Sequence, residues 1–149
     1  MPLGGYVVLT AVFHALVALA VLALRRSGRP LPERFAASDV VLTGAATHKL
    51  ARLITKDRVT SFARAPFVEY QGSAGPGEVD EKPRGRGLRR SIGELLVCPY
   101  CLGLWIATAF GLGLVAAPRA TRLVALVFSA LGISDFLQIA YKAAEDKLL

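Results

Sequence analysis

The sequence predicts an all-α integral membrane protein: three transmembrane helices, one amphipathic or short tilted helix, and a C-terminal antiparallel helical hairpin. Of the 149 residues, 54% are hydrophobic and only 19% are charged, whereas soluble domains carry roughly 25% charged residues. The charges stand in blocks between long apolar runs, and the mean hydropathy is +0.48. Three of these runs are long enough to cross a bilayer, and each predicted element is considered in order below.

Residues 6–24 predict the first transmembrane helix. This run has no formal charge, and at 1.5 Å per residue it would reach about 28 Å, close to the hydrocarbon thickness. Arg25 and Arg26 follow the run, whereas a cleaved signal peptide has its basic residues before the apolar core, so we expect an uncleaved anchor. His14 lies in the middle of the span. We expect it to face a neighbouring helix as a neutral hydrogen-bonding group, with a ligand role as the alternative.

Residues 38–55 predict a second helix of a different kind. Ser38 suits the N-cap and Asp39 the first turn. One stripe of the helix is apolar and another is basic, consisting of His48, Lys49, Arg52 and Lys56. Such a helix lies in the membrane interface more readily than it crosses. A short tilted crossing is the alternative, if the basic end reaches the headgroups.

Residues 71–87 predict a flexible loop, because seven of these seventeen residues are Gly or Pro. A basic cluster overlaps the end of this loop and precedes the next apolar run; its members are Lys82, Arg84, Arg86, Arg89 and Arg90. We expect the cluster to contact anionic lipid headgroups, at about 1 kcal/mol per residue. The alternative is a topology signal with no specific ligand.

Residues 101–117 and 121–141 predict two further apolar helices. Pro118 and Arg119 interrupt the run, and so short a connection predicts an antiparallel hairpin. Small residues recur every fourth position on the first helix and would let another helix approach closely in lipid; they are Gly103, Ala107 and Gly111.

The chain has the length of one domain. We divide it into an N-terminal anchor helix with its basic linker, residues 1–37, and a membrane domain, residues 38–149. The membrane domain is expected to contain helix 38–55, a flexible basic loop 56–97 and the helical hairpin 98–142.

The distribution of Lys and Arg predicts the topology, because cytoplasmic loops of membrane proteins are enriched in both. If all four helices cross with the N-terminus inside, ten basic residues lie inside and six outside. If helix 38–55 instead lies on the cytoplasmic face, that side holds sixteen and the outside two. We therefore expect a multi-pass protein of the bacterial cell membrane with its N-terminus outside. Residues 25–97 and the C-terminus would then be cytoplasmic.

The stretch Cys98-Pro99-Tyr100-Cys101 has the letters of the glutaredoxin dithiol. A glutaredoxin places them between a strand and a helix of an α/β domain, and no run before Cys98 alternates as a strand would. Pro99 is favoured at the first position of a helix, so Cys98 becomes the expected N-cap and Cys101 lies one turn in. Both sulfurs would lie at the positive end of a helix dipole, which favours thiolate.

Three interpretations of this thiol pair stay open. It can be a structural pair, a redox or sensing dithiol, or part of a metal site. Two thiolates are half of a zinc shell, so metal binding would need His48, Asp135 or the CxxC of a second subunit. No metal and no cofactor are expected from this chain alone.

Asp135 is a carboxylate inside a predicted span. Such a group is costly and usually has a partner, and His48, Lys49 and Arg52 are within plausible reach if helix 38–55 packs there. A structural ion pair is one interpretation, and a proton or ion relay is the other.

Three motifs resemble those of a family of small bacterial membrane proteins of unknown function. They are Arg-Leu-x-x-x-Asp-Arg-Val-Thr at residues 52–60, CPxCxGxW at 98–105 and Ser-Asp-Phe at 134–136. The family is known as domain of unknown function 1360 and includes a Bacillus sporulation protein. The similarity covers about residues 40–142. It implies a membrane location without a known activity, and it draws attention to Asp57, Arg58, Cys98, Pro99, Cys101, Gly103, Trp105 and Asp135.

The sequence thus predicts a non-enzymatic envelope or partner-binding membrane protein, because it has no nucleotide-binding loop, catalytic triad or complete metal shell. The expected partners are the bilayer with anionic headgroups and a membrane protein or a second copy of the chain. Nucleic acid is not expected, since no basic patch interleaved with aromatic residues is present. A membrane thiol redox or metal-binding protein using Cys98 and Cys101 is one alternative. An ion or proton pathway around Asp135 and His48 is another.

Overall fold

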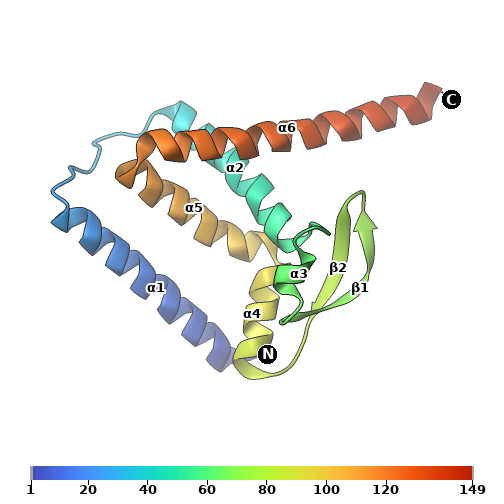
Figure 1. Ribbon diagram of the computed structural model, residues 1–149, viewed down its shortest axis with the longest axis horizontal. Coiled ribbons are helices and arrows are strands. Elements are labelled where there is room, and N and C mark those ends of the chain that lie inside the picture. The colour runs from blue at the N-terminus through green and yellow to red at the C-terminus, as the bar shows by residue number, and fades with distance from the viewer. Residues whose placement is uncertain (1, 149) are drawn as a thin grey trace.

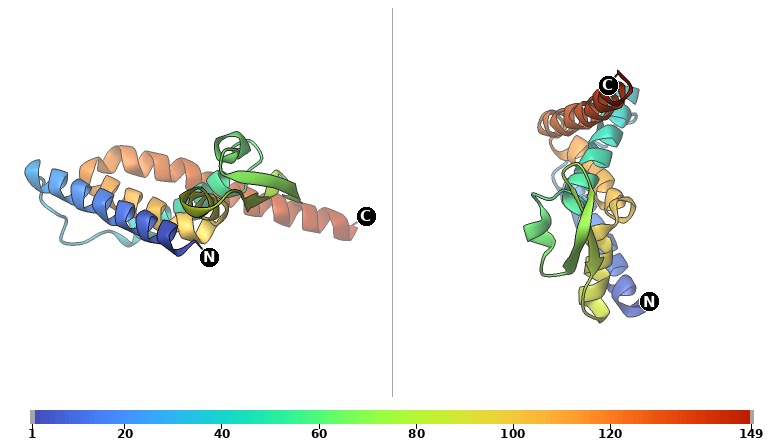
Figure 2. Two further views of the ribbon diagram at one scale, coloured as in Figure 1. Left: turned by 90° about the horizontal axis from the view of Figure 1, so that it is seen from below. Right: turned by 90° about the vertical axis from the view of Figure 1, so that its right-hand side faces the viewer.

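The computed structural model describes residues 2–148, which form six helices and one two-stranded sheet (Figure 1). In chain order the elements are α1 (Leu3–Arg26), α2 (Ala37–Thr55), α3 (Ser61–Arg64), β1 (Val68–Gly75), β2 (Glu78–Pro83), α4 (Gly87–Val97), α5 (Pro99–Ala116) and α6 (Pro118–Leu148). Helices α1, α2, α5 and α6 form the body of the molecule. The β-hairpin lies at the same end as the N-terminus (Figures 1 and 2).

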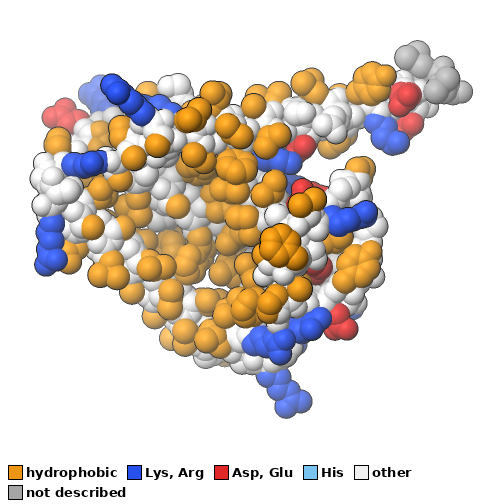
Figure 3. Space-filling model, viewed as in Figure 1, with side chains coloured by type: hydrophobic (Ala, Val, Ile, Leu, Met, Phe, Trp, Pro, Cys, Tyr) orange, Lys and Arg blue, Asp and Glu red, His pale blue; other side chains and the backbone are white. Residues whose placement is uncertain are grey.

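Helices α1, α5 and α6 are the three described helices that are long and apolar enough to cross a membrane. Their side chains are largely uncovered: on α1, Leu3, Val7 and Leu19 are 67%, 69% and 62% exposed. Apolar side chains also cover much of the face seen in Figure 3. A surface this apolar is unusual for a soluble monomer and suits a lipid environment.

Helix α2 runs alongside α6 in the same direction, because contacts between them advance together along both helices. In order they are Asp39 to Arg122, the Leu42 carbonyl to Ser129, and Lys49 to Asp135. The core lies where α2 meets α5 and α6, and its buried members are Ala46, Ala51, Ile106, Phe110 and Ala125. Helix α2, which carries Asp39, Lys49 and Arg52, is therefore packed within the helical body.

Helix α1 begins beside α4 and continues along α5. The Tyr6 hydroxyl donates a hydrogen bond to Glu94 of α4, and the Phe13 and Trp105 rings meet edge to face with centroids 5.0 Å apart. The start of α1, the start of α5 and the end of α2 consequently lie at one end of the molecule. The linker after α1 and the α5–α6 turn lie at the opposite end (Figure 1).

Helices α5 and α6 are separated by Ala117 alone. Gly113 faces Thr121 across this turn, and an added Cβ would lie 2.7 Å from the Thr121 hydroxyl. The helices then diverge (Figure 1), and α2 packs against both. The last part of α6 extends beyond the other helices.

The expectation of an all-α fold is confirmed only in part: the chain is mostly helical, but residues 68–83 form an antiparallel hairpin in the segment that was predicted to be a flexible loop. Val68 pairs with Pro83 and Gly75 with Glu78. Pro76 and Gly77 form the turn, where Gly77 has a φ of 76°, a conformation that a glycine adopts without strain. The glycines that indicated a loop lie instead at a register shift within β1 (Gly72), at the hairpin turn (Gly75 and Gly77), and between β2 and α4 (Gly85 and Gly87).

The start of α2 also differs from the expectation. Ala36 is the N-cap, and no side chain caps this end, so Ser38 does not have the predicted role. Asp39 is in the first turn as expected, but its carboxylate binds Arg122 through two hydrogen bonds of 2.7 and 2.8 Å. A long-range ion pair thus replaces local capping.

Candidate functional site

The start of α5 is built as the sequence predicts. Pro99 occupies the first turn, and Cys98 is the N-cap, with its sulfur accepting a hydrogen bond from the Cys101 N–H at 3.1 Å. Cys98 and Cys101 form a disulfide, with their Cα atoms 5.3 Å apart. Cys101 is exposed, and Tyr100 is 92% exposed. The pair is therefore accessible from outside the bundle.

A pocket of about 300 Å³ lies between this helix start and α2. Its lining residues are Gly44, Thr47, His48, Ala51, Arg52, Pro99, Tyr100 and Gly103. The structure thus brings together two positions of the basic stripe, His48 and Arg52, and two positions of the CPxCxGxW motif, Pro99 and Gly103. The sequence did not predict this arrangement, because the two pairs of residues are far apart along the chain.

Thr47 is a polar residue of the pocket that the sequence did not single out. Its Oγ1 is the one buried side-chain oxygen or nitrogen among residues 2–148 that has no hydrogen-bond partner. Helical threonines commonly donate to the carbonyl four residues earlier, and Thr43, Thr55, Thr108 and Thr121 all do so here. Thr47 makes no such bond although its hydroxyl oxygen is buried, whereas Thr10 of α1, which also makes none, is exposed.

Arg52 connects the pocket to the β-hairpin. Its Nη2 atom lies 2.7 and 2.6 Å from the two carboxylate oxygens of Glu78, and its Nε atom lies 3.0 Å from Oε1. Asp57 lies beside Glu78 in an isolated bridge, and the Arg58 N–H donates to the Gly77 carbonyl at 2.9 Å. The motif positions Asp57 and Arg58 therefore hold the hairpin turn against the end of α2.

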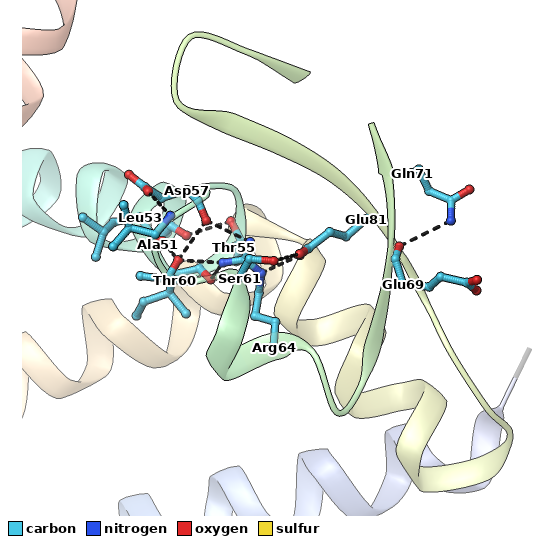
Figure 4. A network of polar contacts seen from close by, with 12 residues as sticks. Ala51, Leu53, Thr55, Asp57, Thr60, Ser61, Arg64, Glu69, Gln71 and Glu81 are labelled. Atoms are coloured by element: carbon cyan, nitrogen blue, oxygen red, sulfur yellow. Dashed lines mark hydrogen bonds and ion pairs between the residues drawn. The ribbon is translucent and has the colours of Figure 1, made fainter. Parts of the chain in front are cut away.

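A buried ion pair fixes the other side of the hairpin (Figure 4). Arg64 and Glu81 have side chains that are 1% and 2% exposed, with Nε and Oε2 2.6 Å apart. Arg64 also donates to the carbonyls of Ile54 and Asp57 at 2.6 and 3.0 Å, and Ser61 donates to Glu81. This network joins α2, α3 and β2. A single Arg and a single Glu in a polar segment gave no local signal of it.

Asp135 pairs with Lys49, with Nζ and Oδ2 2.6 Å apart. Of the three residues expected to reach Asp135, Lys49 is the one that binds it. His48 instead stacks on the Phe136 ring, with centroids 6.1 Å apart. Both residues considered as additional metal ligands for the thiol pair thus have other partners.

His14 is exposed, and its Nδ1 lies 2.8 Å from the Thr10 carbonyl of its own helix. It does not face a neighbouring helix as the sequence suggested, because α1 meets α5 through Phe13 and Trp105.

Gly103 of α5 faces Thr47 of α2, with 3.9 Å between an added Cβ and Thr47 Cγ2.

The basic cluster lies on β2 and at the start of α4, and all five members are exposed. Two of them make local contacts. Arg89 donates to the Pro66 carbonyl at 2.9 and 2.6 Å, and Arg90 lies 3.1 Å from Glu94. Lys82, Arg84 and Arg86 complete an exposed positive surface beside the first turn of α1.

Glu94 joins this surface to α1. The hydrogen bond donated by the Tyr6 hydroxyl, together with a smaller contribution from Arg90, holds the pKa of the Glu94 carboxyl below its ordinary value of 4.5. Glu94 is therefore ionised at neutral pH. The sequence did not indicate this contact, because 88 residues separate the two partners.

Comparison with known proteins identifies a family that matches this chain. The model of a family described as a protein of unknown function, DUF1360, matches residues 42–141, well over half of the chain. The chain belongs to this family. The matched segment begins within α2 and ends within α6, so it contains the pocket, the hairpin and the thiol pair, while α1 lies before it.

Two proteins of Bacillus subtilis strain 168 are similar to this family member. The UPF0713 protein YngL is 31% identical over 96 residues, which cover 64% of this chain and 72% of YngL. The sporulation protein YjcA is 30% identical over 102 residues, which cover 66% of this chain and 86% of YjcA. No solved structure matches the chain significantly.

Proposed function

We propose that this protein is a non-enzymatic integral membrane protein whose four long helices all cross the bilayer and which binds a partner through its β-hairpin end. One observation carries the proposal: the charges of α2 are satisfied by partners on other elements. The pairs are Asp39 with Arg122, Lys49 with Asp135, and Arg52 with Glu78. A charged residue in a membrane is tolerated when it faces the bundle and is paired, so α2 can cross beside α5 and α6.

The pairing of these and other charged residues argues against catalysis. Asp135 is bound to Lys49, and Arg64 is bound to Glu81, so these groups connect elements of the fold. An ionic contact between two helices supports a structural role for Asp135 more than a relay role.

The packing favours an orientation different from the one expected from the sequence. That orientation separates the N-terminus from residues 25–97 by a membrane, and the contact between Tyr6 and Glu94 is incompatible with it. With four crossings, the end that carries the hairpin, the N-terminus and the C-terminus has ten of the basic residues. The positive-inside rule then assigns this end to the cytoplasm.

Reporter fusions test this orientation. A reporter after residue 28 is expected outside in the four-crossing arrangement and inside if α2 lies on the cytoplasmic surface. Fusions after residues 76 and 149 serve as controls, because both arrangements place them inside. Extraction of membranes at alkaline pH tests insertion itself: release of the chain into the soluble fraction would overturn the proposal.

Exposed apolar side chains at the hairpin end support partner binding. Val59 and Phe62 are each 79% exposed, and Tyr70 is 61% exposed, outside the helices that are apolar enough to span. We expect Phe62→Ser to leave membrane insertion intact and to abolish the phenotype that the wild-type gene restores to a deletion strain. Because the relative YjcA is named a sporulation protein, sporulation belongs among the phenotypes to score. Full complementation by Phe62→Ser, with Val59→Ser and Tyr70→Ser equally silent, would argue against a partner at this surface.

A thiol redox role is a second candidate, favoured by the accessible disulfide of Cys98 and Cys101 at a helix start. The hydrogen bond from the Cys101 N–H and the helix dipole both stabilise a Cys98 thiolate. Alkylation of reduced membranes at graded pH tests it. Two results together would exclude this role: wild-type thiols that react only near the ordinary cysteine pKa of roughly 8.5, and full complementation by a Cys98→Ser, Cys101→Ser variant.

A further inference from the structure

The pocket between α2 and α5 has one polar end and one apolar end. His48, Arg52, Thr47 and Tyr100 supply polar groups, and the other lining residues are small or apolar. We propose that this pocket binds one phospholipid with an anionic headgroup, whose phosphate lies beside Arg52 and Thr47. The inference depends on the proposed membrane location and deepens it by naming the ligand.

The Thr47 hydroxyl is the first indication of a ligand. Thr47 lines the pocket, and its hydroxyl oxygen is buried without a hydrogen-bond partner among the described residues. A buried hydroxyl without a partner costs about 1–3 kcal/mol. A phosphate or ester oxygen in the pocket would accept its hydrogen bond, as the carbonyls do for the neighbouring threonines.

Arg52 supplies the second indication. Its hydrogen bonds to Glu78 use Nε and Nη2, so within residues 2–148 the Nη1 amino group is left to donate to an anion. The side chain is 43% exposed. The start of α5 adds the partial positive charge of a helix N-terminus on the opposite wall. Because Glu78 already neutralises the Arg52 charge, the attraction for a phosphodiester comes from the hydrogen-bond donors of Nη1 and from this helix start.

Two glycines create the space for a chain. An added Cβ at Gly44 would meet no atom within 4 Å, and one at Gly103 would reach only Thr47 Cγ2 at 3.9 Å. Because α2 and α5 run in opposite directions, the next turn beyond Gly44 carries Val40 and the next turn beyond Gly103 carries Ala107. Both are exposed, so an apolar surface continues from the pocket toward the middle of the helices.

The change from polar to apolar lining along the pocket matches the change from headgroup to acyl chain along a lipid. The polar end lies where α5 begins, which is the headgroup level in the proposed arrangement, and the apolar surface leads toward the bilayer centre. A free anion would not need the apolar extension, and a helix from a second copy would leave the Thr47 hydroxyl unsatisfied.

The test uses the full-length protein in nanodiscs made of equal parts of phosphatidylglycerol and phosphatidylcholine. After release into the gas phase, native mass spectrometry counts the lipids that stay bound. We expect one phosphatidylglycerol per chain. Gly44→Leu, which fills the pocket, should reduce retention by about tenfold, and Thr47→Val by about threefold, since about 1.4 kcal/mol is a factor of ten. Gly4→Leu is the matched control, because Gly4 also has open space around it.

Several outcomes would overturn the inference. Equal retention of both lipids would remove the headgroup specificity. Displacement of the lipid by millimolar inorganic phosphate would indicate a free-anion site. A dimer that Gly44→Leu dissociates would assign the pocket to a second copy. Failure of the chain to enter nanodiscs at all would instead count against the proposed membrane function, which keeps the two failures distinguishable.

Discussion

The Tyr6 hydroxyl donates a hydrogen bond to Glu94, which joins the first turns of α1 to α4 across 88 residues of sequence. This contact ties α1, which lies outside the matched family segment, to the segment that carries the basic cluster. It also fixes which end of α1 accompanies the β-hairpin.

The contact should depend on pH. The Glu94 pKa is lowered in the folded protein, chiefly by the Tyr6 hydrogen bond. The contribution of the ionised Glu94 carboxylate to the stability of the fold is therefore complete above the ordinary pKa of 4.5. It is lost as the pH falls through the lower folded value. We expect Tyr6→Phe to raise the Glu94 pKa toward 4.5, which an NMR titration of the carboxyl group would measure. An unchanged pKa in Tyr6→Phe would contradict this assignment.

Gly5 permits the same approach of helices. A Cβ at this position would overlap the Ser91 hydroxyl and lie 2.8 Å from Ser91 Cβ, whereas one at Gly4 meets nothing within 4 Å. Gly5→Ala should therefore lower stability by about 1–3 kcal/mol, measured as thermal unfolding in detergent. Gly4→Ala should leave it nearly unchanged. Addition of Ser91→Gly to Gly5→Ala should restore much of the loss.

The buried pair of Arg64 and Glu81 should be intolerant of single changes. Arg64→Met leaves the Glu81 carboxylate buried without its partner, which costs about 3–5 kcal/mol. The exposed pair of Arg90 and Glu94 offers a comparison, since Arg90→Gln should cost no more than about 1 kcal/mol. Limited proteolysis of the hairpin would report the difference, and equal resistance of both variants would show that the buried network does not hold the hairpin.

Lys49 and Asp135 permit a test that separates a structural role from proton transfer. Asp135→Asn should lower thermal stability because Lys49 loses its partner. The double variant Lys49→Met, Asp135→Leu should recover stability, because apolar replacement of a partly buried pair is often neutral or stabilising. Complementation by this double variant would support a structural pair. A stable double variant that fails to complement would revive the relay interpretation.

The sequence was most informative where one element determines its own structure. Long apolar runs predicted α1, α5 and α6, and Pro99 predicted both the start of α5 and the N-cap role of Cys98. These features depend on residues within one helix or one turn of each other. Local rules are sufficient for them.

The hairpin and the pocket depend on distant partners, and for that reason they escaped prediction. The residues of strand β2 alternate between buried and exposed, with Val79 and Glu81 buried. From the sequence, a glutamate is expected at an exposed position, and Glu81 is buried because it pairs with Arg64. The position of α2 was obscured in the same way. Its basic stripe indicates a surface helix unless Asp135 and Glu78 are known to neutralise Lys49 and Arg52.

The pairing of α2 with residues synthesised much later has a consequence for biogenesis. A charged residue at the centre of a helix resists insertion by about 2.5–3.5 kcal/mol, and α2 leaves the ribosome before Arg122 and Asp135 exist. If the bundle is embedded as proposed, α2 is expected to stay at the translocon or in the headgroup layer until α6 has been synthesised and can pair with it. A nascent chain truncated ahead of Pro118 should therefore keep this segment accessible to water-soluble reagents, and completion of α6 should withdraw it.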